Sequence, residues 1–278
     1  MMNKWRGFFV LSRPVNVAIS FLSICVAIAI CGWSTWKNVL FACLTGACLT
    51  AAANAINDVY DLEIDRINRP RRPLPSGVIT SREAFAFSII FFLLGLTSSA
   101  LINAETLIIA LIFSVLLYLY SSTFKRQVLV GNFTVSLATA FAFIFGGVAV
   151  KRVEHAIFPA AFAFLLHFGR EIIKDMEDID GDQQNGAQTL PIRFGLRPAQ
   201  ILTTIFLMAL IVITQVPFFL NIYGLWYLII VNIGVNTVLL YAICSMWKKP
   251  VKSNFRILSA MLKINMVVGL AAIYAGRF

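Results

Sequence analysis

The sequence predicts an all-α, polytopic membrane protein with about nine transmembrane helices in one domain that spans residues 1–278. Two observations support this prediction. Hydrophobic residues make up 59% of the chain and charged residues only 13%, about half the share found in a soluble domain. The apolar residues also gather in runs that are long enough to cross the hydrocarbon core of a bilayer as helices.

The predicted spans lie at residues of about 15–33, 38–57, 84–102, 105–121, 131–150, 156–173, 199–220, 222–246 and 255–275. The first span follows a basic N-terminal segment without a small-residue cleavage site, so we expect no cleavable signal peptide. Five cysteines lie in or near the spans without metal-ligand spacing, and we expect them to pack as small apolar side chains.

Lysines and arginines concentrate in alternate loops, and this asymmetry predicts how the spans are oriented. With a cytoplasmic N-terminus, the cytoplasmic segments hold most of the basic side chains, whereas the opposite segments hold only Lys37, Lys151, Arg152 and Arg277. The basic cytoplasmic loops explain the formal net charge of +10, so we expect no nucleic-acid partner. The predicted location is the cell membrane, with the functional site facing the cytoplasm.

Three aspartates follow the second predicted span. Asp58, Asp61 and Asp65 are three and four residues apart, so they would share one face of a helix. Carboxylates this close repel one another unless a cation lies between them, and at membrane depth each costs roughly 2.5–3.5 kcal/mol. The spacing therefore indicates a cation-binding site at the end of this span.

A second acidic cluster follows the sixth predicted span, at Asp175, Asp178, Asp180 and Asp182. Each cluster leads into a long loop with a basic stretch that contains proline and glycine, at residues 71–77 and 190–195. Similar motifs four spans apart suggest a duplicated half, and such repeats often place a shared site at their interface. We therefore expect the two clusters to face each other.

The clusters predict a magnesium-dependent site for a diphosphate. Mg²⁺ takes oxygen ligands and bridges substrate phosphates, which suits paired carboxylates. Basic side chains would neutralise the remaining phosphate charge, and we expect this of Arg72, Lys125, Arg126 and Lys174. Metal ion and cations together make diphosphate a good leaving group. Because the middle spans are rich in aromatic residues that can shelter an allylic cation, we predict transfer of a prenyl group from its diphosphate to a lipid-soluble acceptor among the membrane lipids.

These motifs resemble those of the UbiA superfamily of intramembrane prenyltransferases over nearly the whole chain. The family motif Asn-Asp-x-x-Asp-x-x-x-Asp matches Asn57, Asp58, Asp61 and Asp65, and its Asp-x-x-x-Asp motif matches Asp178 and Asp182, with Asp175 one turn earlier. The first motif continues into Arg-Pro-Leu-Pro-Ser-Gly at residues 72–77, which makes the match specific. The resemblance implies nine helices around a central cavity, Mg²⁺-bound diphosphate beneath a cytoplasmic cap, and a lateral opening to lipid.

The motifs and the resemblance together assign expected roles. We expect catalytic roles for Asp58, Asp61, Asp65, Asp178 and Asp182, and metal ligation by the same five residues with Asn57 and Asp175. The expected substrate-binding residues are Asn16, Asn54, Asn57, Arg72, Tyr120, Lys125, Arg126, Arg170 and Lys174. For Asn16 and Asn54, hydrogen bonding between helices is the alternative role. Tyr120 precedes Lys125 by five residues, where the family pattern has four.

The stretch at residues 170–178 resembles the archaeal-type lipid branch of the superfamily, which implies transfer of a geranylgeranyl group to the hydroxyl group of geranylgeranylglyceryl phosphate. An aromatic acceptor, as in quinone, tocopherol, haem or chlorophyll pathways, is the close alternative. From another class, an ion or metabolite transporter is the alternative, because intramembrane acids often mark ion paths. The sequence leaves the oligomeric state open.

Overall fold

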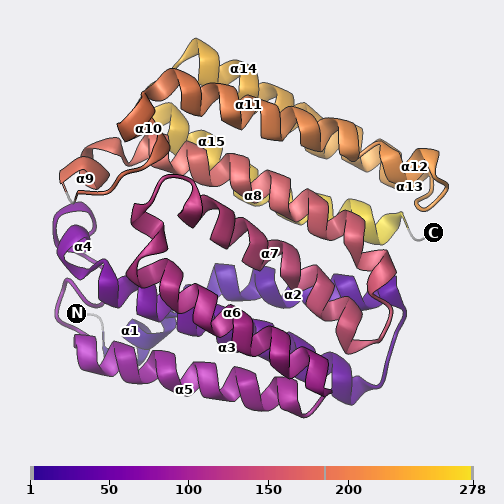
Figure 1. Ribbon diagram of the computed structural model, residues 1–278, viewed down its shortest axis with the longest axis horizontal. Helices are drawn as coiled ribbons and strands as arrows, with labels where there is room; N and C mark the ends of the chain where they lie inside the picture. Colours follow the sequence, from indigo (N-terminus) through magenta and orange to yellow (C-terminus); the bar gives the residue numbers. More distant parts are fainter. Residues whose placement is uncertain (1–2, 185, 277–278) are drawn as a thin grey trace. The chain divides into compact units, whose positions relative to one another are not determined.

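The computed structural model describes residues 3–184 and 186–276, and within them every regular element is a helix (Figure 1). Nine helical segments of the described chain are long and apolar enough to cross a membrane: Pro14–Cys31, Trp36–Tyr60, Ser81–Ala100, Ala104–Ser122, Val130–Ala149, Val153–Glu177, Leu196–Phe219, Leu225–Lys248 and Lys252–Ala275. Each coincides with one of the predicted spans, so the all-α, multi-pass prediction is confirmed.

The chain divides into two compact units, and the first comprises the described part of Met1–Lys125 together with Ile144–Glu154. Its helices are α1 (Lys4–Leu11), α2 (Pro14–Cys31), α3 (Trp36–Tyr60), α4 (Leu62–Asn68), α5 (Ser81–Ala100) and α6 (Ala104–Ser122). Helix α3 is central within this unit, because it packs against α2, α5 and α6. The first acidic cluster therefore follows directly from the best-packed helix of the unit.

Glycines allow α3 to approach its neighbours closely. A Cβ atom at Gly46 would lie 2.2 Å from the Cδ1 atom of Ile24 on α2, and one at Gly95 would lie 2.8 Å from the Cδ2 atom of Leu49 on α3. Membrane helices often associate through small residues, because van der Waals packing drives their contact in lipid. These two positions therefore hold α3 between α2 and α5.

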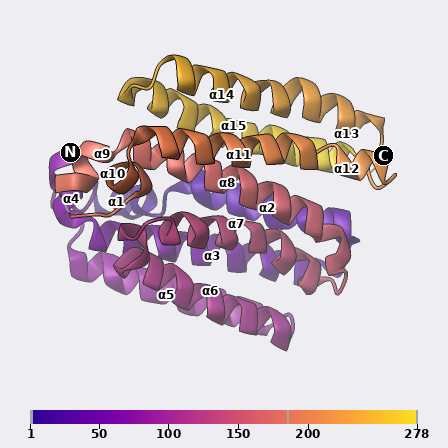
Figure 2. The same ribbon diagram turned by 45° about the horizontal axis from the view of Figure 1, so that its top comes forward.

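The second unit comprises Arg126–Phe143 and the described part of His155–Phe278. Its helices are α8 (Ile157–Glu177), α9 (Ile179–Gln184), α10 (Leu190–Phe194), α11 (Leu196–Ile213), α12 (Val216–Phe219), α13 (Leu225–Ile230), the π-helical η3 (Val231–Asn236), α14 (Thr237–Lys248) and α15 (Lys252–Ala275). Helix α8 packs against α11 and α15, and α14 packs against the same two helices (Figure 2).

Three elements cross the boundaries between the units. The 3₁₀ turns η1 (Phe124–Arg126) and η2 (Val153–Ala156) lie at two of these boundaries, and α7 (Val130–Ala149) contributes residues to both units. Large apolar side chains stay exposed along the spans, as at Leu93, Ile108 and Ile264. Extended exposed apolar surface of this kind is typical of helices that contact lipid.

Candidate active site

The first acidic motif lies where α3 passes into α4. Asp61 has φ −91° and ψ 3°, which ends α3 and begins α4. The backbone bonds nevertheless keep a helical spacing, because the amide of Asp61 donates to Asn57 at 2.9 Å and that of Asp65 donates to Asp61 at 2.8 Å. Asp58, Asp61 and Asp65 are consequently buried together, with exposed fractions of 4%, 6% and 4%. The predicted clustering of the three carboxylates is confirmed.

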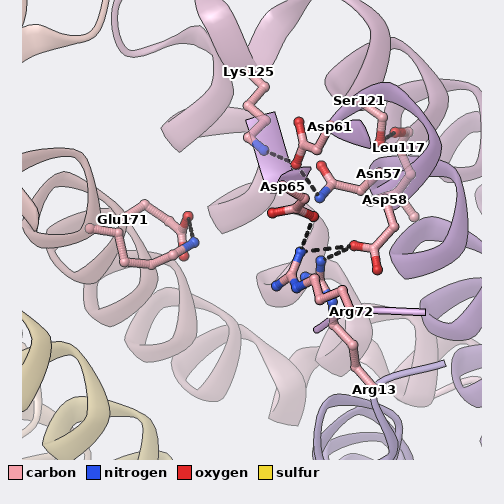
Figure 3. A network of polar contacts seen from close by, with 11 residues as sticks. Arg13, Asn57, Asp58, Asp61, Asp65, Arg72, Leu117, Ser121, Lys125 and Glu171 are labelled. Carbon is pink, nitrogen blue, oxygen red and sulfur yellow. Dashed lines mark hydrogen bonds and ion pairs between the residues drawn. The ribbon is translucent and has the colours of Figure 1, made fainter. Parts of the chain in front are cut away.

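Basic side chains from three other segments neutralise these aspartates (Figure 3). Arg72 donates to Asp65 at 2.5 Å and to Asp58 at 3.3 Å. Arg13 also pairs with Asp58, and Lys125 pairs with Asp61. A buried carboxylate costs several kcal/mol unless it is paired and hydrogen-bonded, so the cations are what permit this cluster to be buried.

A small apolar cluster holds two of these cations in place. Leu11 and Leu74 are buried in one core cluster, and each is separated by a single residue from a basic partner, Arg13 or Arg72. The loop after Arg72 turns back through Gly77, whose φ of +75° is rarely adopted by residues with a side chain. Burial of the leucines therefore fixes the backbone from which both guanidinium groups reach the aspartates.

Arg13 is a site residue that the sequence motifs do not reveal. In the sequence it is one basic residue of the segment before the first span, whereas in the structure it reaches Asp58 across 45 positions. Arg13 has a left-handed φ of 53°, directly before Pro14. A residue before proline avoids the helical region for steric reasons, and this is the one sequence feature that marks the position as unusual.

The donor atoms of the first cluster suit Mg²⁺. The three aspartates offer carboxylate oxygens, and the buried Oδ1 atom of Asn57 has no hydrogen-bond partner, while its Nδ2 atom donates to Asp61 at 2.9 Å. Across the described chain, no three His, Cys, Asp or Glu side chains converge into a ready metal cluster. In this structure Arg13, Arg72 and Lys125 pair with the carboxylates. The residues present therefore fit a hard cation that takes oxygen ligands.

The second acidic motif shows the same helix break. Helix α8 ends at Glu177, Asp178 follows with φ −101° and ψ 12°, and α9 begins at Ile179. The backbone amide of Asp182 donates to the carbonyl of Asp178 at 2.9 Å. In the first motif the backbone amide of Asp65 donates to the carbonyl of Asp61 at 2.8 Å. This shared local geometry supports the predicted similarity between the two halves of the chain.

Asp175 is set apart from the other members of the second cluster. It lies within α8 and accepts a hydrogen bond at 2.8 Å from the Nδ2 atom of Asn132 on α7. Asp178 and Asp182 are half-buried, and Asp180 is exposed. Asp180 pairs with Lys252 at 3.5 Å, which is consistent with its omission from the expected metal ligands.

The two basic residues of α8 do not pair with these aspartates. The Nη1 atom of Arg170 lies 3.1 Å from Oε1 of Glu171, and the Nζ atom of Lys174 lies 2.7 Å from Oε2 of the same residue. Glu171 is only 7% exposed. Sequence reasoning missed Glu171 because it stands outside the motif spacing, although a carboxylate between two basic residues on one helix was a usable signal.

Asn16 and Asn54 lie on neighbouring helices of the first unit. The Nδ2 atom of Asn16 approaches Oδ1 of Asn54 at 3.5 Å, and the Nδ2 atom of Asn54 donates to the carbonyl of Ser12 at 2.9 Å. Hydrogen bonding between helices, which was the alternative role for these residues, is therefore confirmed. Their contact with a substrate stays a prediction.

Tyr120 and Arg126 lie near the end of the fourth span. Tyr120 is half-buried, whereas Arg126 is exposed and belongs to the second unit, where its carbonyl accepts from the amide of Gln188 at 2.9 Å. The hydroxyl group of Tyr118, two residues before Tyr120, lies 2.8 Å from the hydroxyl group of Tyr60. A substrate role for Tyr120 or Arg126 stays a prediction.

Comparison with known proteins places this chain in a family. A model of the UbiA prenyltransferase family matches residues 17–267 of the chain. The chain belongs to the UbiA prenyltransferase family. As a UbiA-family protein, it is a multi-pass membrane prenyltransferase. It is 40% identical over 238 residues to the digeranylgeranylglyceryl phosphate synthase of Methanocaldococcus jannaschii, a match that covers 86% of this chain and 81% of the relative.

Solved structures of UbiA proteins show the same fold. A structure from work on digeranylgeranylglyceryl phosphate synthase in membranes matches with a TM-score of 0.80 and 36% identity, over 99% of both chains. A UbiA homologue from Archaeoglobus fulgidus, solved with GPP and Mg²⁺, matches with a TM-score of 0.69 and 20% identity, over 96% of this chain and 99% of that one. The second likeness, at 20% identity, shows the fold alone.

Proposed function

We propose that this UbiA prenyltransferase transfers a geranylgeranyl group from geranylgeranyl diphosphate to the hydroxyl group of geranylgeranylglyceryl phosphate, a step of archaeal-type ether-lipid synthesis. The observation that carries the proposal is the buried group of Asp58, Asp61 and Asp65 with three cations in contact. This arrangement is suited to a metal-bound diphosphate. The choice of acceptor rests on the similarity to digeranylgeranylglyceryl phosphate synthases at 40% and 36% identity.

The donor-binding role follows from the chemistry of the first cluster. We expect Asp58, Asp61, Asp65 and Asn57 to hold Mg²⁺, which when bound would neutralise diphosphate oxygens and make diphosphate a better leaving group. With the metal ion bound, the aspartates would no longer need their present partners, and Arg72 and Lys125 could donate to phosphate oxygens. Arginine suits this exchange because its planar guanidinium group binds carboxylate and phosphate alike.

The remaining assignments follow the family motifs. We propose that Asp175, Asp178 and Asp182 also ligate Mg²⁺, and that Asp58, Asp61, Asp65, Asp178 and Asp182 are the catalytic acids. The other proposed substrate-binding residues are Asn16, Asn54, Tyr120, Arg126, Arg170 and Lys174. The family match covers parts of both compact units, and it supports our proposal that residues 1–278 act as one prenyltransferase domain.

We propose that the catalytic site faces the cytoplasm. The support is the basic character of the loops that follow both acidic clusters, because Lys- and Arg-rich loops stay on the cytoplasmic side. The test compares Arg71→Cys and Lys37→Cys, each made in a variant whose five native cysteines are replaced by alanine, in intact cells treated with a membrane-impermeant thiol reagent. Labelling of Lys37→Cys but not of Arg71→Cys is the expected result, and the opposite pattern would reverse the orientation.

A transfer assay tests the reaction. Purified protein in detergent receives geranylgeranyl diphosphate and Mg²⁺ with either geranylgeranylglyceryl phosphate or an aromatic acid as acceptor. We expect diphosphate release and a doubly prenylated glycerol phosphate only with the first acceptor. Transfer to the aromatic acid alone would remove the lipid assignment, and no diphosphate release with any acceptor would overturn the proposed function.

A further inference from the structure

The basic residues of α8 are held in a different way from those around the first motif. In the first unit, Arg72 and Lys125 pair with motif aspartates. In the second unit, Arg170 and Lys174 pair with Glu171, which is outside both motifs. Metal binding by the motif aspartates would therefore leave Arg170 and Lys174 with the same partner as before. These two cations remain available for an anion that arrives without a metal ion.

Glu171 and the backbone orient this basic pair before any ligand binds. Arg170 donates through Nε to the carbonyl of Ser259 on α15 at 3.0 Å, in addition to its contact with Glu171. The side chain of Arg170 is 15% exposed and that of Lys174 is 37% exposed, so both retain accessible surface. Arg170, Lys174 and Lys263 of α15 outnumber the carboxylates of Glu171 and Asp175, which leaves an excess positive charge in a segment where charges are costly and commonly functional.

His167 extends the same face of α8 deeper into the span. It lies three residues before Arg170 and seven before Lys174, a spacing that puts the three side chains on one side of the helix. The Nδ1 atom of His167 is buried and has no hydrogen-bond partner. Three cations, Lys263 of α15, Arg170 and Lys174, interact electrostatically with His167, as does the carboxylate of Glu171. A buried, unpartnered ring nitrogen among cations points to an anionic ligand.

We infer that His167, Arg170 and Lys174 bind the phosphate group of the acceptor, while Glu171 positions the two cations. This inference rests on the proposed function, because it identifies the phosphate of geranylgeranylglyceryl phosphate as the ligand. The reacting hydroxyl group of that acceptor is on the carbon next to the one that bears the phosphate, so the phosphate must bind close to the reacting atoms. Lys174 is suitably placed, because it precedes the motif residue Asp178 by one helical turn of about 5.4 Å.

Aromatic side chains adjoin the basic face on its membrane side. The ring of Phe164, one turn before His167, lies 5.6 Å from the ring of Phe133 and 5.8 Å from that of Phe168, centroid to centroid. The order along α8 is therefore aromatic residues, histidine and then cations, towards the end that carries Asp178. This order matches an amphiphile whose phosphate points to the loop and whose prenyl chain extends into the apolar span.

The test compares acceptors with and without the phosphate group. The full-length enzyme receives geranylgeranyl diphosphate, Mg²⁺ and either geranylgeranylglyceryl phosphate or its dephosphorylated alcohol. We expect Lys174→Gln to lower kcat/KM for the phosphorylated acceptor roughly 10- to 100-fold, mainly through KM, because one hydrogen bond to a charged group is lost. The KM for the donor and the rate with the alcohol should stay within about twofold. Lys174→Arg should restore most of the preference for phosphate.

Two further variants make the outcome decisive. Lys248→Gln removes an exposed lysine from the end of α14. It should leave kcat/KM unchanged for both acceptors. His167→Gln should also lower kcat/KM for the phosphorylated acceptor. It therefore provides a second test if Lys174→Gln folds poorly. If Lys174→Gln raises the donor KM and keeps the preference for phosphate, the pair serves the donor and the inference is wrong. If the wild-type enzyme uses neither acceptor, the proposed function itself fails.

Discussion

Replacement of Arg72 with glutamine tests whether the cations hold the first acidic cluster together. Arg72 donates to Asp65 at 2.5 Å and to Asp58 at 3.3 Å, and its side chain is 21% exposed. Asp58 keeps Arg13 as a partner, so the loss falls mainly on Asp65. Removal of one partner from a buried ion pair costs about 3–5 kcal/mol, and the partial exposure of Arg72 favours the lower end. We expect a loss of about 3 kcal/mol in unfolding free energy.

Thermal unfolding in detergent with EDTA measures this loss. For a chain of this size each kcal/mol corresponds to about 2–4 °C, so Tm should fall by roughly 6–12 °C. Arg71→Gln is the matched control, because Arg71 is the adjacent arginine and is exposed. Added Mg²⁺ should recover much of the loss in Arg72→Gln, since a metal ion can neutralise the same carboxylates. Equal Tm values for the two variants would refute the reasoning.

The pH dependence provides an independent check on the same variant. Burial raises the pKa of Asp65 above its ordinary value of 3.8, and the Arg72 guanidinium opposes this rise. A carboxyl group whose pKa is raised by folding contributes stability that is present below the ordinary pKa and is lost as the pH rises through the raised value. Without Arg72 that pKa rises further. The Tm difference between wild type and variant should therefore be small near pH 4 and grow towards neutral pH; a constant difference would contradict this account.

Three further predictions concern the metal ion and the packing. Asp61→Ala and Asp182→Ala should each abolish turnover while membrane insertion, followed by fractionation, is retained; residual activity near the wild-type level would exclude metal roles for these residues. Chelation by EDTA should stop diphosphate release and added Mg²⁺ should restore it, whereas activity in EDTA would argue against a magnesium enzyme. Gly146→Val should lower thermal stability by about 1–3 kcal/mol, because a Cβ atom there would lie 2.6 Å from the Cβ atom of Ala27. Gly269→Ala is the control, because the added Cβ atom would have no neighbouring atom within 4 Å. This substitution should be neutral or stabilising.

The spans and the two acidic motifs could be predicted because they depend on local properties. Hydropathy over about 20 residues is enough to identify a membrane helix, and every predicted span has a counterpart among the described helices. The shared face of Asp58, Asp61 and Asp65 likewise follows from local helical spacing, which the backbone hydrogen bonds keep through the break at Asp61. Neither inference requires knowledge of which distant segments meet.

The partners of the charged side chains required tertiary structure. Arg13 reaches Asp58 across 45 positions and Lys125 reaches Asp61 across 64. Both were visible as basic residues in the sequence, but only the packing of the surrounding helices selects them from the many lysines and arginines of the loops. The pairing of Glu171 with Arg170 and Lys174 was not predicted for another reason. The sequence suggested only a substrate-binding role for these two basic residues.

Residue spacing and local hydropathy establish the membrane class and the family, and they identify the carboxylates of the proposed donor site. The tertiary structure decided which cations compensate which acids. That choice depends on buried anchors such as Leu11 and Leu74, which bring Arg13 and Arg72 to the same carboxylate, Asp58. It also separated Arg170 and Lys174 from the motif aspartates by pairing them with Glu171. The physical reason is that a buried charge must find its counter-ion in space, whatever its distance along the chain.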